Sequence, residues 1–153
     1  MPGAMPSALF IEPATVADLD AIHAIERDAF RKLWPRDAFE AELTREHAHV
    51  EVARAPEVVG FCNYWIVDVS GEIHILSIAT HPAHRRAGVG ARLLAHALDA
   101  GRARGATLAT LEVRRGNRAA IALYERAGFR TVHVRKAYYQ DDGEDALVML
   151  AEL

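Results

Sequence analysis

Two arginines and two glycines occur together in the segment Arg85-Arg86-Ala87-Gly88-Val89-Gly90. Glycine lets a backbone approach a ligand closely and take left-handed conformations. A helix is expected directly after this segment, and its free N–H groups and positive dipole end favour bound anions. Arg92 and the two preceding arginines could add charge-assisted hydrogen bonds. The segment is therefore a candidate pyrophosphate site, although a plain loop-to-helix junction would use the same two glycines.

Glu112 is an acidic residue inside an otherwise apolar segment, Leu108 to Val113. A carboxyl group buried in such a strand has a raised pKa, as a general base working near neutral pH requires. We therefore expect a buried Glu112 that can accept a proton. The simpler alternative is a residue facing solvent on a half-exposed strand.

Other reactive side chains give weaker signals. Cys62 stands in an apolar, strand-like segment, which is typical of a small buried side chain rather than a nucleophile. The pairs His81 and His84, and His47 and His49, have no further ligands at a suggestive spacing. No metal site is expected.

The patterns around these residues predict alternating helices and strands. Thr15, with Asp18 three residues on, is typical of a helix N-cap, and Pro35 can open a second helix. Asn117 is a good N-cap for a later helix that ends at Gly128. The expected strands are 10–13, 50–52, 58–67, 72–80, 107–113, 129–134 and 146–150, and the expected long helix is 87–104.

These elements give the order βααββββαβαββ or close to it, with the number of middle strands left open. We expect a single α+β domain with a central, mostly antiparallel sheet of about seven strands and about four helices. The domain is expected to span residues 9–153, after a flexible lead-in of residues 1–8.

Length and charge exclude several classes of protein. The chain has 153 residues, which suits one domain, and its net charge of -3 argues against a general nucleic-acid binder. The apolar runs are far shorter than the ~20 residues of a membrane helix, and the first residues lack the pattern of a signal peptide. A cytoplasmic protein is expected.

The motifs together resemble a known superfamily. The Arg-x-x-Gly-x-Gly pattern, preceded by Ile78 to Pro82, resembles the acyl-coenzyme A signature of the GNAT N-acetyltransferases, and the segments 111–114 and 117–129 resemble its second half. Residues 30–39 and Tyr138-Tyr139 followed by 143–149 are similar to the RimI family, which acetylates the N-terminal alanine of a small-subunit ribosomal protein. Two departures are Thr80-His81-Pro82 in place of Val-Asp-Pro and Gly116 in place of serine or alanine.

The resemblance implies that acetyl-coenzyme A is the acetyl donor and a protein N-terminus the acceptor. Glu112 matches the family's proposed base, and the Tyr124 hydroxyl would serve the coenzyme sulfur. A backbone N–H near Ile78 or Ala79, at a strand bulge, would stabilise the oxyanion. The residues implied in coenzyme binding are Ile78, Ala79, Thr80, Arg85, Arg86, Ala87, Gly88, Val89, Gly90, Ala91, Asn117 and Tyr124.

The nature of the acceptor is left open by the sequence. The acidic cluster Asp141, Asp142, Glu144 and Asp145 is either a solvated turn or the mouth of a groove for a basic peptide. Trp34, Phe39 and Tyr64 could line the opposite wall or belong to the core. Two other functions stay open: acetylation of a small amine or lysine, and a module that binds acyl-coenzyme A without turnover.

Overall fold

The computed structural model describes residues 9–30 and 34–153, so the expected lead-in of residues 1–8 lies outside the described residues. Its elements follow the order βααβββαβαββ, so the number of middle strands, which the sequence left open, is three. The strands are β1 (Phe10–Pro13), β2 (Ala48–Arg54), β3 (Val58–Val67), β4 (Glu72–Thr80), β5 (Leu108–Arg114), β6 (Arg130–Arg135) and β7 (Ala146–Glu152). The helices are α1 (Leu19–Ala29), α2 (Arg36–Thr44), α3 (Val89–Ala103) and α4 (Arg118–Arg126), with short 3-10 turns at Val16–Asp18 and Pro82–His84.

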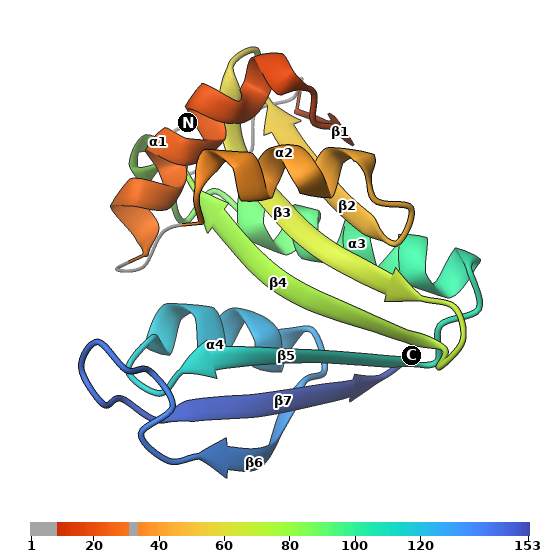
Figure 1. The fold of residues 1–153 in the computed structure, drawn as a ribbon, viewed down its shortest axis with the longest axis vertical. Coiled ribbons are helices and arrows are strands. Elements are labelled where there is room, and N and C mark those ends of the chain that lie inside the picture. The colour runs from red at the N-terminus through yellow and green to blue at the C-terminus, as the bar shows by residue number, and fades with distance from the viewer. Residues whose placement is uncertain (1–8, 31–33) are drawn as a thin grey trace.

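The seven strands form one sheet in the order β1-β2-β3-β4-β5-β7-β6. Every neighbouring pair is antiparallel except β4 and β5, which are parallel. These two pair only from Glu72 and Leu108 to Ile75 and Leu111, although both strands continue beyond that point. They therefore diverge and open a V-shaped gap in the backbone of the sheet (Figure 1). The ends of β4 and β5 that carry the candidate site residues form its two sides.

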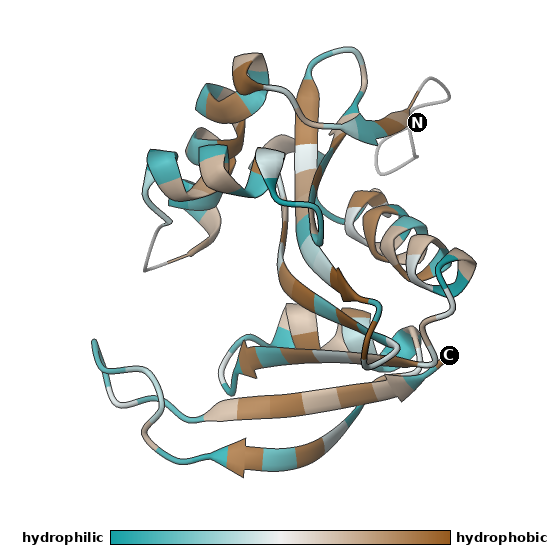
Figure 2. Cartoon of the chain, turned by 45° about the vertical axis from the view of Figure 1, so that its right-hand side comes forward, coloured by the Kyte–Doolittle hydropathy of each residue, from teal (hydrophilic) through white to brown (hydrophobic). Residues whose placement is uncertain are grey.

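Helices cover the two faces of the sheet unequally. In Figure 1, α1 and α2 lie in front of β2, β3 and β4, and α3 lies behind them. The hydrophobic cluster beneath α1 and α2 is separate from the larger cluster that joins α3 and Tyr124 of α4 to the sheet. Figure 2 shows hydrophobic and hydrophilic residues alternating along β5 and β6. In β5 this alternation matches one buried face, whereas β6 is exposed along most of its length.

Local sequence explains where the helices begin. Thr15 is the N-cap of the first turn, and its N–H donates to Asp18 Oδ2 at 2.9 Å, which confirms the predicted capping pair. Pro35 precedes the first residue of α2, also as predicted. Helix α3 begins at Val89 rather than Ala87 because Gly88 takes the left-handed conformation, with φ of 83°.

A β-bulge interrupts β4 just where it leaves β5. Ser77 pairs with Asn63 and Ile75 with Tyr64, so Leu76 has no opposite residue in β3. Ile78 and Ala79 are in regular register, so the bulge lies two to three residues before its expected place. A bulge frees backbone groups from the ladder, and this one does so beside the V-shaped gap.

No helix within residues 9–30 and 34–153 combines the length and apolar character needed to cross a membrane.

Candidate active site

The loop between β4 and α3 has the backbone expected of an anion site. Gly88 is the N-cap of α3 at a positive φ, and Arg86 also has a positive φ, of 65°. The first N–H groups of α3 have no partners within their own helix and carry the positive end of its dipole. The geometry of this loop thus fits a bound pyrophosphate.

Two glycines bring the segments around this loop close together. A Cβ on Gly60 would lie 3.0 Å from both the Ala79 carbonyl oxygen and Val89 Cγ1, so glycine allows α3 to begin directly against the sheet. A Cβ on Gly90 would lie 3.5 Å from Leu123 Cδ2 and 3.7 Å from Thr80 Oγ1. The end of β4, the start of α3 and the helix α4 therefore meet at Gly90. These are the three segments predicted to hold the coenzyme.

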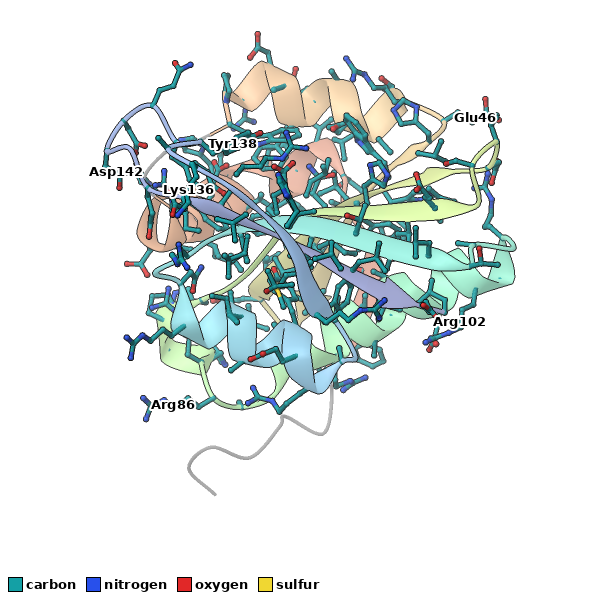
Figure 3. All side chains as sticks on the ribbon, turned by 90° about the horizontal axis from the view of Figure 1, so that it is seen from below. Glu46, Arg86, Arg102, Lys136, Tyr138 and Asp142 are labelled. Atoms are coloured by element: carbon teal, nitrogen blue, oxygen red, sulfur yellow. The ribbon has the colours of Figure 1, made fainter. Side chains whose placement is uncertain are left out.

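The two arginines of the loop differ in their contacts. Arg85 donates from Nε to the Thr80 carbonyl oxygen at 3.3 Å and from its terminal nitrogen to Asp28 Oδ2 at 2.7 Å. Its guanidinium therefore ties the loop to α1. Arg86 is exposed and points away from the ribbon (Figure 3). Phosphate binding by either arginine remains a prediction, and Arg86 has the freer side chain.

Glu112 is not buried, and that expectation was wrong. Its side chain is 37% exposed, and its Oε2 lies 3.1 Å from Arg135 Nε of β6. Neighbouring Leu111 and Val113 point to the opposite face, into the cluster beneath α3 and α4. The other face of β5 borders the gap and has no helix over it (Figure 1), so the carboxylate stays accessible.

Tyr124 lies on the opposite side of β5 from Glu112. It is 7% exposed, its ring centroid is 5.8 Å from that of Phe129, and it shares the hydrophobic cluster of Leu111 and Val113. Burial raises the pKa of its phenol, so the hydroxyl keeps its proton near neutral pH. The strand thus separates an accessible carboxylate from a buried proton donor.

Asn117 has the predicted capping role, because its Oδ1 accepts from the Ala120 N–H at 3.2 Å. The glycine before it also has a structural reason. The Gly116 N–H donates to Glu144 Oε2 at 2.8 Å, and a Cβ at Gly116 would lie 2.6 Å from that oxygen. Glu144 therefore ties down this turn, and a serine or alanine at position 116 would require the Glu144 carboxylate to shift.

Arg114 is a functional candidate that the sequence reasoning missed. Its guanidinium donates to three of the clustered acids, and its Cζ lies 3.9 Å from the ring centroid of Tyr139. The acceptors are Asp141 at 3.0 Å, Asp142 at 3.1 Å and Glu144 at 3.2 Å. The position two residues after Glu112 on the same strand face is the signal that would have found it.

The acidic cluster is therefore neither a free acidic mouth nor a simple solvated turn. Asp145, its fourth member, pairs with Arg115 at 2.8 Å and lies 3.5 Å from Lys136. Arg114, Arg115 and Lys136 offset much of the cluster's negative charge. The pairs made by Arg114 and Arg115 also hold the segment between β6 and β7 against the end of β5. Figure 3 shows Lys136, Tyr138 and Asp142 together at this edge of the molecule.

Other expected wall residues are mostly core. Phe39 is 1% exposed between Trp34 and Phe61, and Tyr64 is also 1% exposed, with its hydroxyl donating to Glu51. Cys62 is buried, as predicted, and burial raises the pKa of its thiol. Within the described part of the chain, no group of three or more His, Cys, Asp or Glu side chains is placed to hold a metal ion.

Acyl transfer from a thioester carried on a nucleotide requires a phosphate site, a base for the attacking group and a donor for the leaving sulfur. The gap between β4 and β5 brings candidates for all three to one place, with the base and the donor on opposite faces of β5. The fold and these candidates define the class of acyl-coenzyme A-dependent transferases. The chain belongs to the Acetyltransferase (GNAT) family, whose model matches residues 19–129.

Within this family, the chain is similar over nearly its whole length to acetyltransferases that are named for their acceptor. The chain is 33% identical over 141 residues to the ribosomal protein bS18-alanine N-acetyltransferase of Escherichia coli K12, covering 91% of this chain and 94% of that one. It is 36% identical over 148 residues to the N-alpha-acetyltransferase RimI of Mycobacterium tuberculosis, covering 90% and 92%. The crystal structure of the ribosomal-protein-S18-alanine N-acetyltransferase from Escherichia coli superposes with a TM-score of 0.84 at 32% identity, covering 94% and 93%.

Proposed function

We propose that this N-acetyltransferase moves the acetyl group of acetyl-coenzyme A onto the N-terminal alanine amine of a ribosomal protein of the bS18 type. The observation that carries the proposal is the placement of Glu112 and Tyr124 on opposite faces of β5, beside the gap. Amine and coenzyme can then approach the same point from different sides of the sheet. The names and full-length similarity of the relatives support alanine as the acceptor residue.

The donor site in this proposal consists of backbone and the start of α3. The N–H groups after Gly88 bind the pyrophosphate, with Arg86 beside them. The backbone of Ile78 to Thr80 binds the arm that carries the thioester. Acetyl-coenzyme A supplies an activated acetyl group, and a backbone N–H beside the bulge at Leu76 stabilises negative charge on its carbonyl oxygen.

Glu112 and Tyr124 move the protons. An α-amino group has a pKa near ~8, so a carboxylate acting directly or through a water molecule suffices to remove its proton. Glu112 takes that proton as the amine nitrogen attacks the thioester carbon. When the carbon–sulfur bond breaks, Tyr124 gives its hydroxyl proton to the sulfur. The Arg135 guanidinium pairs with this carboxylate, with Arg135 Nε 3.1 Å from Glu112 Oε2.

The acceptor in this proposal lies on the face of β5 that carries Glu112. The segment between β6 and β7 borders this face, and Tyr139 is fixed there beneath Arg114. Tyr138 is 45% exposed and offers an aromatic surface for the first residues of a peptide. Because ribosomal proteins are made in the cytoplasm, the enzyme is proposed to act there.

Acetyl transfer to synthetic peptides, followed by mass spectrometry, tests the proposal. The set comprises a basic peptide that begins with alanine, its N-terminally blocked twin with a lysine, and a panel of small amines. Modification of the free N-terminus alone is expected. Glu112→Gln should then lower kcat/KM by roughly 10²-fold, because the base is lost while the side chain keeps its shape.

The other outcomes separate the remaining functions. Transfer only to lysine or small amines would contradict the proposed N-terminal acceptor but would still agree with acetyltransferase activity. Binding of acetyl-coenzyme A without transfer to any of these amines would favour the non-catalytic module. In either case the proposed ribosomal acceptor would be abandoned.

A further inference from the structure

Arg114 is the last residue of β5 and lies on the strand face that also carries Glu112. Its side chain is only 19% exposed, although arginine side chains are mostly exposed in folded proteins. Three carboxylates accept hydrogen bonds from its guanidinium, and the ring centroid of Tyr139 lies 3.9 Å from its Cζ. The proposed reaction gives this highly connected side chain no step of its own.

Tyr139, the aromatic partner of Arg114, lies near both residues proposed to move protons. Burial raises the pKa of the Tyr139 phenol, and the negative charge of Glu112 adds to that rise. Tyr139 in turn contributes to the raised pKa of Tyr124, after burial and Cys62. Electrostatic effects of this kind fall off with distance, so Tyr139 is close to the proposed reaction centre.

The turn that carries Tyr139 is shaped by its own backbone. The Tyr139 N–H donates to the Glu144 carbonyl oxygen at 3.1 Å, and the Gly143 N–H donates to the Tyr139 carbonyl oxygen at 2.7 Å. These two bonds stay within the turn and do not join it to the sheet. Arg114 does so, because a planar guanidinium can donate to several carboxylates and stack on a ring at the same time.

Other attachments hold the C-terminal end of this segment. Arg115 pairs with Asp145 at 2.8 Å, and the Gly116 N–H donates to Glu144 Oε2 at 2.8 Å. The cation–π contact with the aromatic ring belongs to Arg114. The ring and the end of the segment therefore depend on different anchors.

The charge balance of the turn also depends on Arg114. Its guanidinium lies between carboxylates that follow one another closely in the sequence: Asp141, Asp142 and Glu144. Without it, these like charges would repel one another. The turn would then move away from β5, and Tyr139 would move with it.

We infer that Arg114 is a positioning residue for the acceptor, an inference that rests on the proposed acetyl transfer to a peptide. The guanidinium holds the ring of Tyr139 on the side of β5 that carries Glu112, so that the ring forms a fixed wall for the first residues of the peptide. Arg114 acts through Tyr139 and takes no part in proton transfer.

Steady-state kinetics of Arg114→Ala with two peptides that begin with alanine, one basic and one neutral, test the inference. KM for both peptides should rise by about tenfold while kcat stays within about threefold, the pattern of lost acceptor binding. Acetyl-coenzyme A affinity should not change, because the loop before α3 is apart from this turn. Figure 3 shows Arg86 of that loop well separated from Lys136 and Asp142.

Arg114→Lys separates positioning from charge. Lysine keeps the positive charge but lacks the planar fork, so KM for both peptides should stay raised by at least about threefold. Full recovery in this variant would show that Arg114 only masks the acids, and the inference would be wrong. A lower KM for the basic peptide in Arg114→Ala would lead to the same conclusion.

Arg115→Ala is the matched control, because Arg115 is the next residue and pairs with the same segment. Its side chain is 55% exposed, so KM for both peptides should change by less than about twofold. Tyr139→Ala should raise KM as Arg114→Ala does. The double variant should be no worse than either single variant, because both remove the same wall. Additive effects would contradict a role of Arg114 through Tyr139.

Hydrogen exchange tests the anchor without acetyl transfer. The Tyr139 and Gly143 N–H groups should exchange at least about tenfold faster in Arg114→Ala than in the wild type, and Arg115→Ala should not show this increase. Unchanged exchange in Arg114→Ala would overturn the inference. Failure of the wild type to acetylate either peptide would instead overturn the proposed acceptor, and exchange would still decide whether Arg114 holds Tyr139.

Discussion

The two residues proposed to move protons differ because their surroundings differ. Glu112 stands on the uncovered face of β5 beside Arg135, and its side chain is 37% exposed, so an amine or a water molecule can reach the carboxylate. Tyr124 is buried among apolar side chains, which favours the neutral phenol. The carboxylate is thus accessible to the acceptor, and the phenol keeps the proton that its proposed step uses.

At this scale, Tyr124→Phe is expected to lower kcat by about 10²-fold, because the leaving thiolate loses its proton donor. The ring and its packing on Phe129 remain, so acetyl-coenzyme A should bind as before. Single-turnover kinetics together with coenzyme titration measure the two effects separately. Unchanged kcat would remove Tyr124 from the reaction, and a loss of coenzyme binding would make its role structural.

At the scale of elements, the junction between β4 and α3 depends on one backbone conformation. Gly88 has a φ of 83°, which side chains with a Cβ adopt only with strain. The strain is relieved only if the chain moves, and such a move would turn the first N–H groups of α3 away from a bound phosphate. The anion site and the start of α3 therefore depend on the same residue.

Gly88→Ala is expected to destabilise the fold by about 1–2 kcal/mol and also to weaken the binding of acetyl-coenzyme A. Gly105→Ala is the matched control, because Gly105 has a φ of 84°, lies at the other end of α3, and has open space around its Cα. Urea unfolding should show similar losses for both variants. Equal coenzyme affinity in the two would contradict a phosphate site at Gly88.

At the scale of the whole molecule, the gap follows from how the two hydrophobic clusters divide the sheet. One cluster fixes α1 and α2 over β2 to β4, and the other joins α3 and α4 across both halves. The face of β5 opposite α4 is left uncovered.

Ion pairs also join segments that are far apart in the sequence. One of them joins Asp18, beside α1, to Arg54 of β2 at 2.7 Å.

This pair predicts an acid-dependent loss of stability. The hydrogen bond from Arg54 lowers the pKa of Asp18 below its unfolded value of about 3.9. The resulting stability is complete above that value and is lost as pH falls through the folded pKa. Asp18→Asn should cost about 1–3 kcal/mol at pH 7. Urea unfolding at pH 7 and pH 2.5 should show this difference shrinking with acid, and a constant difference would contradict it.

The sequence by itself determined the elements and the loop. Helix caps such as Thr15 and Asn117, breaks such as Pro35, and the strand periods are local properties, and they are found where predicted, within a few residues. The same holds for the glycines before α3, because a left-handed residue and a helix N-terminus are set by a few neighbouring positions. The motifs also sufficed to indicate the family.

Only the tertiary structure decided which side of each element is covered. Glu112 is exposed because β4 and β5 part beyond Ile75 and Leu111, a matter of pairing between segments far apart in the sequence. Asp141, Asp142 and Glu144 are paired because Arg114, 27 to 30 residues away in the sequence, donates hydrogen bonds to them. Burial and charge pairing depend on long-range packing, which residue types and spacing along one segment do not encode.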